Sequence, residues 1–451
     1  MTVIRSFTNT FTKAVSLAGR WRAAAHEFKS SPIGHILIKT LGSLQSNIFL
    51  LIVIKAKLGL GFSCNDKPKS YYGSLCGAIS SVKASDLGAI VIKEALHRAN
   101  IKGDEISEVI IGQCLTAGQG QNPGRQASIK AGIPESVPAY TINMLCGSGL
   151  KSVCLGYQSV LCGADIVVCG GQESMSLSPH VMFMRSGVKM GHSQLSDTML
   201  CDGLMDSMHD IHMGITAENI CKKYNISRQD QDEFAAESQN KVEAAQKAGH
   251  FSKEIIPIVI PSRKGPVTVS EDEYPKHGTT VETLSKLRPC FDKEGTVTAG
   301  NASGVNDGAA AVVLMSSKLA KVKGLTVLAH IKAIAQVGVD PLIMGIGPIP
   351  AVRAVATKAG WSLDEVDLFE LNEAFAVQSL AVIRELGVDP KKVNIQGGAV
   401  ALGHPIGASG CRVLVTLLHA LERTNGHKGI ASLCIGGGMG VAIAVQRFHE
   451  L

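Results

Sequence analysis

Apolar positions along the chain follow two spacings in turn, and this alternation predicts strands followed by helices. Between residues 86 and 97 apolar side chains recur at helical spacing, whereas 109–112 is a short apolar run ending in glycine, as in a buried strand. Further strands are predicted at 139–145, 165–169, 366–370, 429–433 and 441–445, and further helices at 150–161, 227–248, 349–359, 373–386 and 408–423. Such alternation indicates the α/β class, with a sheet covered by helices.

Two parts of this pattern resemble each other. One strand leads into a Cys-Gly-Ser-Gly run at 146–149, and another leads into a Cys-Ile-Gly-Gly-Gly run at 434–438. Between them, residues 177–300 break the rhythm because they are more polar and rich in Met and His, and the alternation resumes near Thr326. We therefore predict two related α/β domains with a polar insertion between them.

The N-terminal segment differs from the rest of the chain. Residues 1–35 are basic, rich in Ser and Thr and nearly free of acids, a composition typical of mitochondrial transit peptides. A disordered extension without function fits this composition equally well. The seven apolar residues 48–54 are too few to span a bilayer, which takes about 20. They predict a buried strand or part of a hydrophobic helix, and no secretory signal is recognisable.

Composition and charge narrow the class of protein. With 45% apolar and only 18% charged residues, the 451-residue chain is unlike a disordered protein, and its 12 cysteines are too sparse for a disulfide scaffold. The net charge of +6 is unevenly distributed, since residues 1–63 hold eight Lys or Arg and one Glu. That segment carries +7 and leaves −1 for the remainder. The main body therefore lacks the basic excess that a nucleic-acid-binding domain would need.

Cys146 is the first candidate for chemistry. It lies where a predicted strand passes into a helix, a place where the helix dipole and free N–H groups favour a thiolate. The neighbouring glycines would let a substrate reach backbone N–H groups. The pattern therefore predicts that Cys146 is a nucleophile at a tight turn. A buried structural cysteine is the alternative, because most free cysteines lie in cores.

Three further residues occupy similar junctions. His404 lies in a glycine-rich loop at 397–410 that lacks the phosphate-binding motifs of nucleotide sites, and a plain turn histidine is the alternative. Cys434 ends a strand and is either a core residue or reactive; the spacing of Cys and His argues against zinc and predicts no metal site. Asn372 is placed as a helix N-cap, and it could also hold a water beside a reacting carbonyl.

Together these residues predict acyl-transfer chemistry. One thiolate can accept an acyl group, a second can remove a proton next to a carbonyl, and a histidine with glycine N–H groups can stabilise oxyanions. Strand ends of open α/β sheets are where ligands bind.

In their order and spacing, the motifs of Cys146, Asn372, His404 and Cys434 resemble those of the thiolase family, and the resemblance extends from about Gly73 to the C-terminus. The stretch 300–309 resembles the branch that forms acetoacetyl-CoA. The resemblance implies two related α/β halves, stacked as layered sheets and helices, with an inserted loop domain. It divides the chain into an extension at 1–71, an N-terminal domain at 72–326 with the insertion at 177–300, and a C-terminal domain at 327–451.

The resemblance also implies a reaction, a reversible Claisen condensation of two acetyl-CoA into acetoacetyl-CoA and CoA, as in mevalonate and ketone-body metabolism. Cys146 would carry the acetyl group, His404 would activate it and, with a water on Asn372, line one oxyanion hole. Cys434 would be the acid/base, and N–H groups of Cys146 and Gly436 would form the second oxyanion hole. The residues implied for CoA binding are Leu204, His212, Met213, Lys276, Thr283, Ala299, Ser303, Ala374 and Phe375.

No cofactor is implied besides the CoA thioesters themselves, and a homodimer or homotetramer in the cytosol is expected, with the mitochondrion as the alternative. Two other functions stay open. One is a 3-ketoacyl-CoA thiolase of fatty-acid β-oxidation, and the other is a catalytically impaired splice form that binds only CoA or partner subunits.

The chain departs from the family pattern at its first strand. Family members begin with an apolar strand just before the loop that here starts at Tyr72, but residues 61–71 are polar. We expect either that this core strand is absent or that 48–54 replaces it through a long connection. An altered gene model or splice form would explain the difference equally well.

Overall fold

The structure, a computed structural model, describes residues 50–58, 75–261 and 265–448. The predictions made for residues 1–35 lie outside this range. None of the helices in the described residues is both long and apolar enough to cross a bilayer. Every cysteine that the structure describes is a free thiol.

The first half is built on a mixed sheet in the order β1-β12-β4-β2-β3. β12 runs antiparallel to both of its neighbours, whereas β2 runs parallel to β4 and to β3. The strands are β1 (Leu50–Leu58), β2 (Glu108–Gly112), β3 (Ala139–Ile142), β4 (Ile166–Ser174) and β12 (Asp307–Ser316). β9 (Ile255–Ile256) pairs with the end of β1.

The second half has its own run of strands, in the order β14-β15-β16-β13. These strands are β13 (Ala329–Gly338), β14 (Leu368–Leu371), β15 (Lys428–Ile435) and β16 (Met439–Gln446). β1 also pairs with β13 through Leu50, Leu51 and Ile52, so the two runs join edge to edge.

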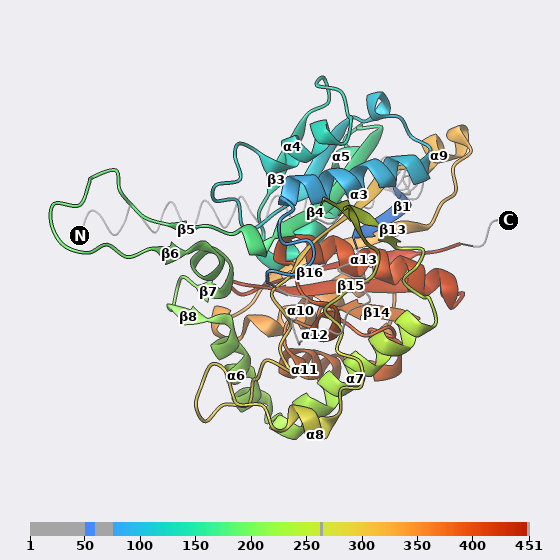
Figure 1. Ribbon diagram of the computed structural model, residues 1–451. Coiled ribbons are helices and arrows are strands. Elements are labelled where there is room, and N and C mark those ends of the chain that lie inside the picture. The colour runs from blue at the N-terminus through green and yellow to red at the C-terminus, as the bar shows by residue number, and fades with distance from the viewer. Residues whose placement is uncertain (1–49, 59–74, 262–264, 449–451) are drawn as a thin grey trace, which may run out of the picture. The chain divides into compact units, whose positions relative to one another are not determined.

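Helices fill the space between and outside the two runs of strands, which gives five layers (Figure 1). The central helices are α5 (Ser148–Leu161) and α13 (Ile406–Arg423), and α13 is buried from Ile406 to Leu421 because its residues are apolar or small on nearly every side. α3 (Ala84–Ala99) and α4 (Pro123–Lys130) cover the outer face of the first half. α10 (Pro348–Ala359) and α11 (Ala376–Leu386) cover that of the second.

Strand side chains point alternately into these layers. On β12, Val312 and Leu314 pack against the central helices, whereas Val313 and Met315 pack against α3. Both faces of each sheet are therefore apolar, which explains why the strands read as continuous apolar runs.

The segment between β4 and β12 forms the insertion. Its main helices are α6 (Met213–Tyr224) and α7 (Arg228–Lys247), and Ser227 caps α7 by accepting a hydrogen bond from the backbone N–H of Asp230. Its smaller elements are β5 (His180–Val181), β6 (Ser196–Asp197), β7 (Met205–Asp206), β8 (Ile211–His212), β10 (Ile258–Ile260), β11 (Val267–Val269) and α8 (Val281–Leu284). Elsewhere, α9 (Ser317–Lys323) follows β12, and α12 (Ala399–Leu402) precedes α13.

The elements predicted from the sequence are present, with three corrections. The strand expected at 139–145 ends at Ile142, because Leu145 takes a positive φ of 47° and opens a tight turn. The helix expected from 373 begins at Ala376 with Phe375 as its N-cap, so Asn372 is not a cap. No element was expected at 307–316, where β12 forms one of the longest pairings of the sheet.

The expected gap at the first strand is filled by β1. Its backbone pairs with β12 and β13, so the replacement of the missing strand by the apolar run is confirmed from Leu50 onward. The connection at 59–74 lies outside the described residues.

Candidate active site

The beginnings of α5 and α13 meet at glycines, and this contact brings Cys146 and His404 together. A Cβ on Gly149 would lie 2.7 Å from the backbone nitrogen of Cys411, and one on Gly410 would lie 2.2 Å from that of Leu150. Only glycine allows the two backbones to approach this closely. Cys146 lies in a single 3₁₀ turn, Leu145–Gly147, directly before α5, and His404 lies in the short loop before α13.

The turn that carries Cys146 is held by Ser148. The Ser148 hydroxyl accepts a hydrogen bond from the backbone N–H of Met144 at 2.8 Å and donates one to the carbonyl of Leu145 at 2.6 Å. These bonds stabilise the left-handed conformation of Leu145, which costs a residue with a side chain about 1 kcal/mol or more. The thiol is thereby presented at the start of α5.

His404 is buried and oriented by Ser409. Its Nδ1 lies 2.6 Å from the Ser409 hydroxyl, which itself donates to the carbonyl of Pro405. Nε2 has no hydrogen-bond partner among the described residues. Burial and the nearby Arg412 lower the pKa of His404 to about 3, so the imidazole is neutral at physiological pH.

Asn372 lies directly behind His404. Its backbone N–H continues the pairing of β14 with β15 by donating to the carbonyl of Ser432 at 3.0 Å. Its side-chain nitrogen lies 3.5 Å from Nδ1 of His404, and its oxygen accepts a hydrogen bond from Arg412 at 3.4 Å. Arg412 in turn lies 3.9 Å from the carboxylate of Glu370, so both charges are paired in the interior.

Both candidate cysteines are thiols in the resting protein. Burial raises the pKa of Cys146 to about 11, although the backbone N–H groups of Gly436 and of Cys146 itself act in the opposite direction. The expected stabilisation of a free thiolate by the helix dipole is therefore outweighed. Burial also raises the pKa of Cys434, and the proximity of Cys146 raises it further. Cys146 must lose its proton to a base during the reaction.

A cavity of about 320 Å³ opens onto these groups. Cys146, His404 and Gly436 line it, whereas Asn372 and Cys434 are buried behind its wall. Six of the residues implied for CoA binding also line it: Leu204, His212, Met213, Ser303, Ala374 and Phe375. The other three, Lys276, Thr283 and Ala299, line a separate hollow of about 200 Å³.

Sequence models of protein-family domains match nearly all of the described chain. "Thiolase, N-terminal domain" matches residues 68–318, and "Thiolase, C-terminal domain" matches residues 325–447. The chain belongs to the thiolase family. The resemblance inferred from the sequence is thereby confirmed, while the division into domains at 72, 177, 300 and 327 stays a prediction.

Similar thiolases carry closely related names. "Acetyl-CoA acetyltransferase, cytosolic" of Rattus norvegicus is 59% identical over 378 residues, which are 83% of this chain and 95% of that protein. "Acetyl-CoA acetyltransferase" of Cupriavidus necator is 58% identical over 83% of this chain and 96% of its own length.

Solved thiolase structures share the fold and confirm the α/β architecture of two halves. The acetyl-CoA acetyltransferase of Bacillus anthracis superposes with a TM-score of 0.84 and 42% identity, over 89% of this chain and all of that one. Human mitochondrial 3-ketoacyl-CoA thiolase superposes with a TM-score of 0.83 and 40% identity, over 89% of this chain and 99% of that one.

Several cavity residues of this thiolase were not found from the sequence. Apolar side chains from distant segments complete the wall, namely Met175, Met199, Leu200, Phe291, Val305, Met344 and Ile406. The Met-rich character of the insertion hinted at some of them. Met344 gave no such signal, because it reaches the cavity only through the packing of the segment after β13 against α6.

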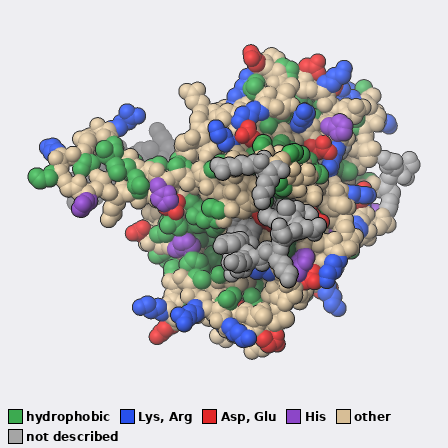
Figure 2. Space-filling view, viewed as in Figure 1, with side chains coloured by type: hydrophobic (Ala, Val, Ile, Leu, Met, Phe, Trp, Pro, Cys, Tyr) green, Lys and Arg blue, Asp and Glu red, His purple; other side chains and the backbone are tan. Residues whose placement is uncertain are grey.

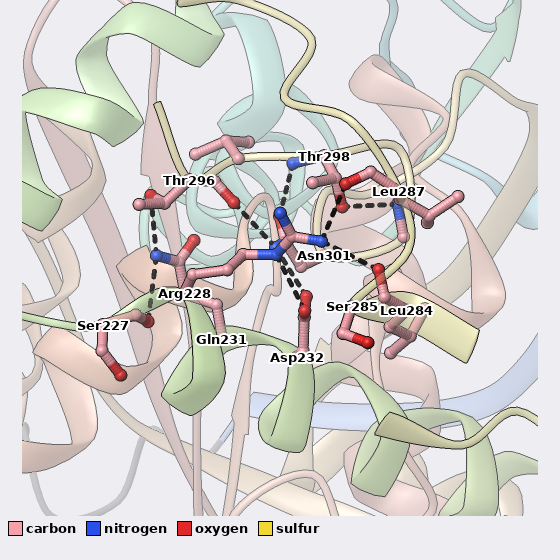
Figure 3. A network of polar contacts seen from close by, with 12 residues as sticks. Ser227, Arg228, Gln231, Asp232, Leu284, Ser285, Leu287, Thr296, Thr298 and Asn301 are labelled. Atoms are coloured by element: carbon pink, nitrogen blue, oxygen red, sulfur yellow. Dashed lines mark hydrogen bonds and ion pairs between the residues drawn. The ribbon is translucent and has the colours of Figure 1, made fainter. Parts of the chain in front are cut away.

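A polar network holds the segment before Ser303 against α7 (Figure 3). Asn301 donates to the carboxylate of Asp232 at 3.0 Å and accepts from the backbone N–H of Thr298 at 2.8 Å. Arg228 pairs with the same carboxylate at 2.8 Å and donates to the carbonyls of Leu284 and Leu287. These bonds fix the segment just before the cavity residue Ser303.

The second hollow has a basic and an aromatic side. The ammonium of Lys276 lies 5.8 Å from the centre of the Tyr274 ring, and the backbone N–H of Lys276 donates to Gln239 at 2.8 Å. Burial lowers the pKa of Lys276. Within the described residues, no group of three or more His, Cys, Asp or Glu is placed to hold a metal ion.

Proposed function

We propose that this thiolase is an acetyl-CoA acetyltransferase that condenses two acetyl-CoA molecules, reversibly, through an acetyl group on Cys146. The observation that supports it is that Cys146, Gly436 and His404, whose Nε2 has no hydrogen-bond partner among the described residues, line one apolar cavity. Relatives 56–59% identical over at least 83% of the chain bear this name, which supports the same activity here.

The first half-reaction transfers the acetyl group to the enzyme. Nε2 of His404 takes the thiol proton of Cys146 as the sulfur attacks the thioester carbonyl, and the Cys434 thiol gives its proton to the departing CoA sulfur, so that an imidazolium and a Cys434 thiolate remain. The N–H groups of Cys146 and Gly436 donate to the oxyanion formed at that carbonyl. Because the resting pair is neutral, the proton moves only when substrate is present.

The second half-reaction forms the carbon–carbon bond. The Cys434 thiolate left by the first half-reaction takes the α-proton of a second acetyl-CoA, whose enolate oxygen is stabilised by the protonated His404 and a water held on Asn372. The enolate carbon attacks the acetyl carbonyl, the bond to the Cys146 sulfur breaks, and His404 returns its proton to that sulfur while Cys434 keeps the α-proton as a thiol. The apolar wall made by Met213, Ala374 and Phe375 keeps bulk water away from these species.

Substrate binding divides between the two hollows. We propose that the apolar cavity takes the acyl group and pantetheine arm, with Leu204, His212, Met213, Ser303, Ala374 and Phe375 in contact. Lys276, Thr283 and Ala299 would then contact the nucleotide end, where an ammonium suits a phosphate. The reaction as written needs CoA thioesters and no further cofactor.

A 3-ketoacyl-CoA thiolase with a longer acyl range is the second candidate, favoured by the close superposition with the human mitochondrial enzyme. Thiolysis rates measured for 3-ketoacyl-CoA substrates of increasing chain length separate the two. We expect acetoacetyl-CoA to be cleaved with the highest kcat/KM. A preference for eight or more acyl carbons would overturn the short-chain proposal.

We propose that the protein is a homo-oligomer that uses the arm between β5 and β6. This arm extends from the body in Figure 1 and carries green apolar side chains in Figure 2. Phe183 is 91% exposed and Met190 is 89% exposed, with Met184 and Leu195 beside them. An exposed apolar patch on a projecting arm is stabilised by covering it, and a second copy of the chain is the occupant we propose.

We place the enzyme in the cytosol, supported by the names of its rat and mouse relatives, which are 59% identical. The basic N-terminus keeps the mitochondrion as the alternative. Imaging a tagged full-length chain beside one that starts at residue 64 distinguishes the two. Mitochondrial signal that is lost on truncation would contradict the cytosolic placement.

A further inference from the structure

Glu173, near the end of β4, accepts hydrogen bonds from both halves of the molecule. Its carboxylate accepts hydrogen bonds from the backbone N–H groups of Cys114, at 3.0 Å, and Leu115, at 3.1 Å, both in the first half. It also accepts a hydrogen bond, at 2.8 Å, from the backbone N–H of Gly407 at the start of α13 in the second half. The side chain is fully buried, so water does not compete for these bonds.

The loop that carries His404 is thus held at both ends by the first half. The backbone N–H of His404 donates to the side chain of Asn306 at 3.0 Å, three residues before the bond from Gly407 to Glu173. The contact is tight, because a Cβ on Gly407 would lie 2.7 Å from the Glu173 oxygen. A Cβ on Gly171 would lie 2.2 Å from the Gly407 carbonyl.

The same carboxylate also organises the wall beside the nucleophile. Cys114, Leu115, Met175 and Ile406 form one buried apolar cluster, and Cys146 packs against it. Two of these residues lie in the loop bonded to Glu173, and Ile406 adjoins Gly407. Displacing the carboxylate would therefore shift the surroundings of Cys146 and the His404 loop at once.

We propose that Glu173 is a positioning residue that fixes His404 relative to Cys146 by joining the two halves of the enzyme. This inference rests on the proposed function, in which His404 takes the proton of Cys146. A carboxylate is required because both of its oxygens accept: one serves Leu115, and the other serves Cys114 and Gly407. An amide of the same shape offers one acceptor and turns an NH₂ group toward an N–H donor.

Protonation of Glu173 would remove an acceptor in the same way as its replacement by an amide. Burial, together with Asp307 on β12, raises the pKa of Glu173 to about 7, while the three N–H donors act in the opposite direction. The other titratable groups facing it are the thiols of Cys114 and Cys146, which stay protonated at neutral pH. His404 titrates far lower, so a loss of rate as pH falls through about 7 would report Glu173.

The test compares Glu173→Gln with Asp367→Asn in the full-length protein. Asp367 is a matched control because its carboxylate also accepts hydrogen bonds from two backbone N–H groups, those of His427 and Lys428. It lies just before β14, whereas Asn372 lies just after it. The measurements are the single-turnover rate of Cys146 acetylation by acetyl-CoA between pH 5.5 and 8.5, the KM, and the urea midpoint.

We expect Glu173→Gln to acetylate roughly 10–100-fold more slowly at pH 8, since small misplacements of catalytic groups cost that much. Its KM should stay within about twofold, and its rate should lose the dependence on pH near 7. Asp367→Asn should match the wild type in rate and pH profile. A Glu173→Gln enzyme with the wild-type rate, or one with a raised KM alone, would overturn the proposal.

Glu173→Asp covers the case in which the amide variant does not fold. It keeps the charge but shortens the reach, so we expect slower acetylation with an unchanged KM and the acid limb retained. A wild-type rate in this variant would also overturn the positioning role. If instead the wild-type protein is never acetylated at Cys146, the proposed function fails, whatever the variants do.

Discussion

Nδ1 of His404 and the hydroxyl of Ser409 lie 2.6 Å apart, one turn along the same segment, and among the described residues Nε2 has no hydrogen-bond partner. Because Ser409 belongs to the helix that follows the loop and also bonds the carbonyl of Pro405, the imidazole is oriented by its own segment of the chain. The histidine can thus act without a carboxylate partner of the kind found in Ser-His-Asp triads.

Ser409→Ala should slow the acetylation of Cys146. Without the hydroxyl, the imidazole loses the contact that orients its ring, and we expect a loss of about tenfold in rate, or about 1.4 kcal/mol in the barrier. Single-turnover CoA release measures it. Thr424→Ala is the control, since its hydroxyl bonds Ala420 at the far end of α13. Equal rates in both variants would exclude this role of Ser409.

Substitution of the two cysteines should separate the half-reactions. Cys146→Ala removes the acyl acceptor, so no acetyl-enzyme should form. Cys434→Ser should leave acetylation measurable but suppress condensation by orders of magnitude, because an alcohol is a much weaker acid than a thiol. Intact-mass spectrometry and acetoacetyl-CoA formation give the two readouts. Full condensation by Cys434→Ser would show that the acid/base assignment is wrong.

The reactivity of Cys146 in the free enzyme should increase with pH. Burial raises its pKa to about 11, so the thiolate fraction should grow about tenfold per pH unit between pH 7 and 10. Alkylation of Cys146 by iodoacetamide, followed by peptide mass spectrometry, measures this fraction. A rate that is already constant above pH 7 would mean that the resting cysteine is a thiolate.

Arg228→Met should destabilise the segment before Ser303 in the cavity wall. It leaves the Asp232 carboxylate buried beside Asn301 without its cation, which typically costs about 3 kcal/mol. Urea unfolding measures the loss, and KM for acetyl-CoA should increase with it. Lys241→Met is the control: its partner Glu237 is largely exposed, so the cost should stay below about 1 kcal/mol. A similar loss in both variants would argue against the network in Figure 3.

Charging the arm should change the oligomeric state. Phe183→Lys combined with Met190→Lys would place two charges in the contact that we propose. Light scattering of the variant should give a smaller mass than the wild type. Val259→Lys, at a 61% exposed position on β10, should leave the mass unchanged. An unchanged mass in the arm variant would contradict an interface there.

Local sequence signals were enough to single out the candidate groups at the cavity. Cys146 and His404 each lie next to a glycine, and Cys434 lies two residues before Gly436, at places where the chain turns tightly and the backbone is accessible. The alternation of strands and helices predicted the layers for a related reason, since each sheet is apolar on both faces.

Features that depend on distant contacts were not predicted. The pairing of β12 with β1 and β4 joins strands that are more than 100 residues apart, and the sequence shows only an apolar run there. Glu173 was overlooked although it stands, with Gln172, at the end of an apolar strand. The partner that explains its burial, Gly407, lies 234 residues further along the chain.

The depressed acidity of Cys146 shows the same limit. Its place before a helix suggested a thiolate, but the burial that raises its pKa comes from both halves closing around it. Only the packed structure shows which of the two effects is larger.

Identifying the residue that carries the acyl group tests the central claim most directly. The purified chain is mixed with acetyl-CoA, quenched within one turnover, and analysed by peptide mass spectrometry beside Cys146→Ala. We predict one acetyl group on Cys146, released CoA in equal amount, and acetoacetyl-CoA on further incubation. An acetyl group on another residue, or no release of CoA by the wild-type chain, would contradict the account.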